Sequence, residues 1–178
     1  MSREAKGTIR SEFAHVVRVF FRHKLGVVGL VMLIMFAGAA AFAPAVAPRD
    51  PYEMDLASPF LPPGSPGYIL GTDNYGRDIL SRLIYGSRIS LLIGIVVVSI
   101  ATVLGSVLGL FAGYYGGWVD NLVMRLVEVF YSFPFLILVI GVMAILGPSI
   151  FNVMLVLGLV SWPLYARLVR AQVIALKS

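Results

Sequence analysis

Long apolar runs without a charged residue constrain this chain more than any other feature. The first, residues 25–46, would form a helix of about 33 Å at about 1.5 Å per residue. That length matches the roughly 30 Å hydrocarbon core of a bilayer. Similar runs follow at residues 90–112, 129–146 and 152–165. The sequence therefore predicts an all-α integral membrane protein with about four transmembrane helices.

The composition agrees with a membrane protein. Of the 178 residues, 59% are hydrophobic and 13% are charged, whereas a soluble domain has about 25% charged residues. No cysteine is present, which excludes a disulfide framework and a zinc–thiolate site. Six of the fourteen Lys and Arg residues precede the first apolar run. Basic residues beside a span favour a cytoplasmic N-terminus, and we do not expect nucleic-acid binding.

The first apolar run has a second interpretation, as a cleaved signal peptide. Ala41, Phe42 and Ala43 imitate the small-residue pattern of a cleavage site. The run is longer than the roughly 7–15 apolar residues of a signal peptide. An uncleaved span is therefore the favoured interpretation.

The polar stretch between the first two runs, residues 70–91, reads LGTDNYGRDILSRLIYGSRISL. The side chains of Thr72, Asp73 and Asn74 can each cap a helix or form a turn. Gly76 permits backbone conformations that other residues resist. The stretch therefore predicts a folded turn directly before a helix.

From Arg77 onward the spacing predicts a short amphipathic helix at the membrane surface. Asp78 and Arg82 are an acid and a base four residues apart, which is the spacing of a helical ion pair. Gly86 and Ser87 are the expected elbow into the next span. An ordinary surface helix before the span is the alternative.

Small residues recur every four positions in the second span. A stripe of this kind lets another helix approach closely, and lining of a substrate path is the alternative. The stripe comprises Ala101, Gly105, Gly109 and Gly113.

The second half of the chain contains three further local signals. Arg125 and Glu128 are spaced to form an ion pair at the membrane edge. Pro134 interrupts the third span after Ser132 and Phe133. The fourth span is expected to end near Pro163.

The sequence contains no pattern of residues that predicts an enzyme. A glycine-rich loop followed by Lys-Ser or Lys-Thr, which would bind a nucleotide phosphate, is missing. His15 and His23 have no cysteine or second histidine at metal-ligand spacing. We therefore expect no catalytic residue, no cofactor and no metal.

Residues 70–91 resemble the signature segment of C-type inner-membrane permeases of the dipeptide, oligopeptide and nickel ABC importers. The pattern is Leu-Gly-Thr-Asp, two variable residues, Gly-Arg-Asp, then Ser-Arg and Gly-x-Arg-x-Ser-Leu. The resemblance extends over nearly the whole chain. The matching positions are Gly71, Thr72, Asp73, Gly76, Arg77, Asp78, Ser81, Arg82, Gly86 and Arg88.

The resemblance implies half of a heterodimeric pore that is completed by a second permease subunit. Two cytosolic ATPase subunits would drive transport, and an extracytoplasmic substrate-binding protein would deliver the substrate. The chain would be a multi-pass protein of a bacterial or archaeal cytoplasmic membrane. Di- or oligopeptides are the expected substrates. Nickel import and a non-transporting membrane scaffold or inactive truncated permease are the alternatives.

Residues 161–178 resemble the segment that leads into the ATPase-facing loop of such permeases. Tyr165, Arg167 and Arg170 would begin the ATPase-facing region. The sequence stops before the expected Glu-Ala-Ala motif and two further spans, so the resemblance implies truncation at the C-terminus. The expected organisation is an N-terminal part (1–69), the signature segment (70–89) and a partial permease domain (90–178).

Overall fold

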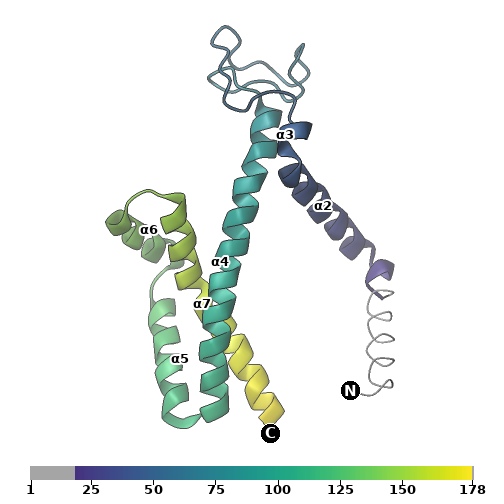
Figure 1. The fold of residues 1–178 in the computed structure, drawn as a ribbon. Helices are drawn as coiled ribbons and strands as arrows, with labels where there is room; N and C mark the ends of the chain where they lie inside the picture. The colour runs from purple at the N-terminus through teal and green to yellow at the C-terminus, as the bar shows by residue number, and fades with distance from the viewer. Residues whose placement is uncertain (1–18, 178) are drawn as a thin grey trace. The chain divides into compact units, whose positions relative to one another are not determined.

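The computed structural model describes residues 19–177, so His15 and most of the basic N-terminal segment lie outside the described residues. The described chain is helical, with isolated β-bridges in place of strands. The chain forms two compact units: the first ends at Ile89 and the second begins at Ser90. The predicted all-α class is confirmed (Figure 1). The helices are α2 (Lys24–Ala41), α3 (Ala43–Val46), α4 (Ile79–Tyr115), α5 (Gly117–Ser132), α6 (Phe135–Leu146) and α7 (Ile150–Lys177).

Three described helices, α2, α4 and α7, are long and apolar enough to cross a membrane. The pair α5 and α6 passes the same test jointly, but the two helices are bent by 88° at the break between them. The described chain thus contains three candidate spans, or up to four if the bent pair counts as one. This agrees with the expectation of about four.

The first apolar run is divided in the structure. Helix α2 ends at Ala41, and the short helix α3 begins at Ala43 with Pro44 in its first turn. Proline has no backbone N–H, so Pro44 cannot donate to the carbonyl of Ala40 and continue α2. The proline-rich loop, residues 47–78, then connects α3 to α4.

A separate amphipathic helix with an elbow at Gly86 and Ser87 is a wrong prediction. Helix α4 runs unbroken from Ile79 to Tyr115. The Ser87 hydroxyl donates to the Ile84 carbonyl at 2.5 Å, within the helix. One glycine inside a helix costs only about 1 kcal/mol relative to alanine, which does not break a helix of this length.

In the second unit, the C-terminal half of α4 shares a core with α5 and α7, which lie beside it in Figure 1. The buried members of this core are Ala112, Val123, Val127, Trp162 and Ala166. The backbones of α4 and α7 come close together because Gly105 and Gly109 of α4 lie against the backbone of α7.

The predicted break in the third span is confirmed at Ser132–Pro134, but the helices around it differ from the prediction. Helix α5 already begins at Gly117, and α6 has 12 residues. At about 1.5 Å per residue α6 is about 18 Å long, too short to cross a bilayer alone.

Pro163 does not end the last helix, contrary to the sequence-based expectation. Helix α7 continues through it to Lys177. Pro163 removes one backbone donor, toward the carbonyl of Leu159, and membrane helices tolerate this loss. Pro163 is buried, and Trp162 and Ala166 on either side of it belong to the core with α4 and α5.

Candidate functional site

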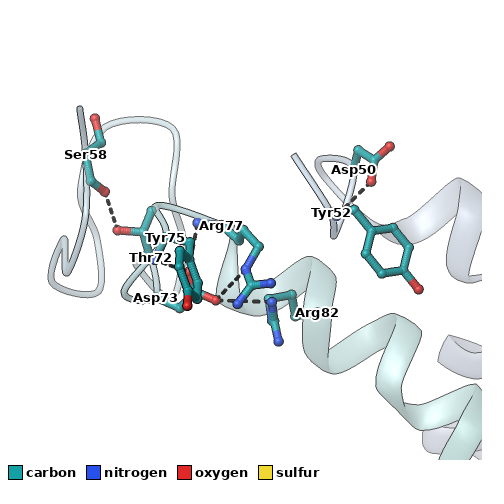
Figure 2. A network of polar contacts seen from close by, with 8 residues as sticks. All are labelled: Asp50, Tyr52, Ser58, Thr72, Asp73, Tyr75, Arg77 and Arg82. Carbon is teal, nitrogen blue, oxygen red and sulfur yellow. Dashed lines mark hydrogen bonds and ion pairs between the residues drawn. The ribbon is translucent and has the colours of Figure 1, made fainter. Parts of the chain in front are cut away.

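Asp73 is the polar centre of the loop between α3 and α4. Its Oδ1 accepts hydrogen bonds from the backbone N–H groups of Tyr75 and Arg77, at 2.8 Å and 3.0 Å. Its Oδ2 accepts from Arg77 Nε at 2.8 Å and lies 3.2 Å from Arg82 Nη1. Figure 2 shows both guanidinium groups directed at this carboxylate. One acid therefore joins the turn to the first part of α4.

Thr72 ties two segments of the loop together. Its hydroxyl donates to the Ser58 carbonyl at 2.6 Å, as Figure 2 shows, and accepts from the Leu61 N–H at 2.9 Å. The Thr72 N–H donates to the Leu61 carbonyl at 3.2 Å. Thr72 is only 3% exposed, so these bonds are shielded from water.

Asp78 caps α4 instead of pairing with Arg82, which corrects the predicted ion pair. Its Oδ2 accepts from the Ser81 N–H at 2.8 Å and from the Ser81 hydroxyl at 2.6 Å. Arg49 donates its backbone N–H to that hydroxyl at 3.0 Å. A capping carboxylate turns toward the first helical turn, so Arg82 pairs with Asp73.

Two glycines of the signature segment occupy positions that no other residue fits. Gly71 and Gly76 have φ of +79° and +72°, in the left-handed region that side chains disfavour. A Cβ on Gly71 would overlap the carbonyl oxygen of Leu61, and one on Gly76 would overlap that of Asp55. The backbone of the loop therefore packs directly against both glycines.

The environment of Asp73 favours its charged form. Partial burial raises the pKa of this carboxyl, but hydrogen bonds from the backbone of Tyr75 and Arg77 and from the Arg77 guanidinium outweigh that effect. The net result is a pKa below the ordinary value of 3.8. The carboxylate is thus fully ionised at neutral pH.

Gly86 and Arg88, the last signature residues, take no part in this network. Both line a cavity of about 550 Å³ together with Arg77 and Arg82. The structure thus divides the signature segment. One group of residues holds the loop, and the arginines also border an open cavity.

The small-residue stripe of α4 lies against α7. A Cβ on Gly105 would come within 2.5 Å of the Trp162 carbonyl oxygen, and one on Gly109 would overlap the Ala166 carbonyl. A Cβ on Gly113 would lie 2.8 Å from Val173 Cβ. Ala101 is 1% exposed. The stripe therefore serves close helix contact in the second unit.

An ion pair that the sequence analysis missed joins α5 to α7. Arg170 donates from Nε and Nη2 to the two carboxylate oxygens of Asp120. The only sequence signal was the presence of opposite charges in a charge-poor region, which favours pairing. Arg125 and Glu128 form the predicted pair at 3.2 Å, with both side chains exposed.

The residues predicted to begin an ATPase-facing region lie on the last helix. Arg167 places its guanidinium carbon 5.6 Å from the centre of the Tyr131 ring, and Arg170 is held by Asp120. Tyr165 packs near Gly105. Across residues 19–177, no group of three or more His, Cys, Asp or Glu residues could hold a metal ion.

Comparison with known proteins identifies two family models in this chain. Residues 11–63 match the N-terminal TM domain of oligopeptide transport permease C. Residues 105–178 match the binding-protein-dependent transport system inner membrane component. The segment between them contains the signature residues and the start of α4.

Individual relatives agree with these models. The dipeptide transport system permease protein DppC of Escherichia coli (strain K12) is 47% identical over 168 residues, which cover 92% of this chain and 55% of that protein. DppC of Haemophilus influenzae is 42% identical over 158 residues, covering 85% of this chain and 54% of the relative. The di/tripeptide transport system permease protein DppC of Pseudomonas aeruginosa is 42% identical over 159 residues, covering 86% of this chain and 52% of the relative.

The chain spans about half the length of these curated relatives. Within that half, the matches include both ends of the described chain, and helices α2, α4 and α7 are long and apolar enough to cross a membrane. The resemblance drawn from residues 70–91 is confirmed. The chain belongs to the family of binding-protein-dependent inner-membrane permeases and fits its C-type members.

Proposed function

We propose that this chain contributes to the membrane pathway of an ATP-driven importer of di- or oligopeptides. The observation that carries the proposal is the 47% identity over 168 residues to a dipeptide transport permease. The glycine contact between α4 and α7 supports it, because a translocation pathway requires helices packed without lipid between them. The chain itself would carry no catalytic residue.

The partners in this proposal follow from the family. A second permease subunit completes the pathway as a heterodimer, two cytosolic ATPase subunits hydrolyse ATP, and an extracytoplasmic substrate-binding protein delivers the peptide. The N-terminus lies in the cytoplasm, which places the loop of residues 47–78 on the outer side. The excess of basic residues before α2 supports this orientation.

Two regions would face these partners. The loop around Asp73, Arg77 and Asp78 would border the outer mouth and contact the binding protein. The region that begins at Tyr165 and includes Arg167 and Arg170 would approach the ATPase. Arg167 is the better target for charge reversal, since Arg170 already holds Asp120 and its reversal would also separate α5 from α7.

Deletion of the gene that encodes the chain, followed by uptake assays in its own cell, tests the proposal. Uptake of a radiolabelled dipeptide should fall to background, and a plasmid copy of the gene should restore it. Uptake of radioactive nickel is measured in parallel. Loss of nickel uptake alone would assign the alternative substrate, and unchanged uptake of both would contradict transport by this system.

Co-purification tests the partners separately. A tag on the chain should recover a second permease and ATPase subunits from gently solubilised membranes. Recovery of the chain without any ATPase would contradict the proposed assembly and favour a non-transporting scaffold.

A further inference from the structure

The cavity of about 550 Å³ in the first unit is unusually basic. It is lined by three arginines, two tyrosines and three small or apolar residues: Arg77, Arg82, Arg88, Tyr52, Tyr85, Pro51, Gly86 and Ile89. Its volume falls within the roughly 300–1,000 Å³ that ligand pockets occupy. None of these lining residues is acidic.

The charges at this cavity do not balance. Within the part of the chain that the structure describes, Asp73 is the one carboxylate paired with these arginines, and it binds both Arg77 and Arg82. Arg88 is an exposed residue, and its guanidinium has no partner among residues 19–177. Three guanidinium groups against one carboxylate leave two positive charges for an anion to neutralise. Guanidinium groups match the geometry of phosphate oxygens.

The position of the cavity along the chain indicates which anion it meets. Arg88 is the last charged residue before an uncharged stretch that continues to Val119. Arginine at such a boundary extends its charged end to the membrane surface. Tyr52 and Tyr85 beside it are of the aromatic type that is enriched at lipid headgroup level. This position in the sequence favours a cavity at the level of the lipid phosphates.

The lining also distinguishes a lipid from a free anion. Ile89, which is 44% exposed, lies at the cavity and begins the apolar part of α4. A phosphate with acyl chains contacts both the arginines and an apolar surface, whereas a free phosphate uses the arginines alone. We propose that Arg77, Arg82 and Arg88 bind the phosphate of an anionic phospholipid headgroup at the membrane surface.

Lipid binding to the purified protein tests this assignment. The protein is delipidated in a nonionic detergent and titrated with phosphatidylglycerol or with phosphatidylcholine of the same acyl chains, and native mass spectrometry measures each Kd. The wild type should bind phosphatidylglycerol more tightly. Arg88→Gln should weaken that binding about fivefold, the effect of one basic residue near an anionic lipid, and leave phosphatidylcholine unaffected.

Matched variants separate a site from general charge. Arg88→Lys should retain most of the preference. Arg125→Gln removes an exposed arginine of the second unit and should leave it unchanged. Equal Kd values of wild type for the two lipids, or equal losses in Arg88→Gln and Arg125→Gln, would overturn the proposal.

Competition identifies the source of the anion. Inorganic phosphate, glycerol phosphate or a dipeptide that binds as tightly as phosphatidylglycerol would overturn the lipid assignment in favour of a soluble anion. Raising the ionic strength requires no variant, and it should weaken phosphatidylglycerol binding selectively because the attraction is electrostatic. Insensitivity to salt would also contradict the proposal.

Discussion

Asp73 accepts bonds from the turn that follows it and from an arginine of α4, so its charge decides how firmly the loop before α4 is held. Two backbone N–H groups and two guanidinium groups converge on one carboxylate. A neutral side chain at this position would keep part of the backbone bonding but lose both ion pairs. Charged hydrogen bonds of this kind contribute about 1.5–3 kcal/mol each, less where a partner such as Arg82 is exposed.

Asp73→Asn should therefore loosen the loop by about 1–2 kcal/mol. Hydrogen exchange in residues 58–78 measures the effect, and Glu53→Gln, an exposed acid of the same loop, is the control. Exchange that rises equally in both variants would show that Asp73 has no special role.

Acid should have the same effect on the wild-type loop. Because the pKa of Asp73 is lowered below 3.8 in the folded loop, its contribution is fully present above that value. It is lost as the pH falls from there through the folded pKa. Loop protection measured by exchange should stay constant at neutral pH and decline below about pH 4. In Asp73→Asn that part of the decline should be absent.

Gly76 and Gly64 allow the cost of a crowded glycine position to be compared with that of an open one. Both have positive φ, but a Cβ on Gly64 meets nothing within 4 Å, whereas one on Gly76 overlaps the Asp55 carbonyl. Gly64→Ala should cost about 1–2 kcal/mol for its backbone conformation alone. Gly76→Ala should cost clearly more and open the loop to protease. Equal cleavage rates in the two variants would contradict the close packing of Gly76 on Asp55.

At the scale of elements, the contact between α4 and α7 depends on glycine. Gly109 has the backbone of Ala166 directly against it, and Gly94 on the same helix has nothing within 4 Å. Gly109→Ala must push backbone away from backbone, since no side chain can yield there. It should lower the Tm of the purified protein by several degrees, from a loss of about 1–3 kcal/mol.

Gly94→Ala is the control for this change. It should leave the Tm unchanged or raise it slightly, because alanine favours a helix by about 1 kcal/mol over glycine. If Gly109→Ala also raised the Tm, the close contact between α4 and α7 would be wrong.

The sequence predicts the ends of these helices correctly where a local rule determines them. It fails where contacts with other helices determine them. The break at Pro134 follows from one missing donor. Pro163 obeys the same rule locally, yet the packing of Trp162 and Ala166 keeps α7 continuous. The choice of Asp73 over Asp78 as the partner of Arg82 was equally hidden, because it depends on Asp78 being used as a helix cap.

For the whole molecule, the proposed orientation can be tested directly because the sequence contains no cysteine. Glu53→Cys, in the loop between α3 and α4, should react with a membrane-impermeant maleimide in intact cells. Arg125→Cys on α5 should react only after permeabilisation. The opposite pattern would invert the topology, and reaction of both in intact cells would contradict the assignment of spans.

The uncharged part of α4 has a consequence for the bilayer that surrounds it. From Ile89 to Tyr115 this helix measures roughly 40 Å, about 10 Å more than the hydrocarbon core. Tyr114 and Tyr115 at its end are exposed and can occupy the headgroup region, which absorbs part of the excess. The remainder is a hydrophobic mismatch, relieved by tilting α4 or by locally thickening the membrane. The energy of this permease therefore depends on bilayer thickness, and lipids with longer acyl chains allow α4 to stand more upright.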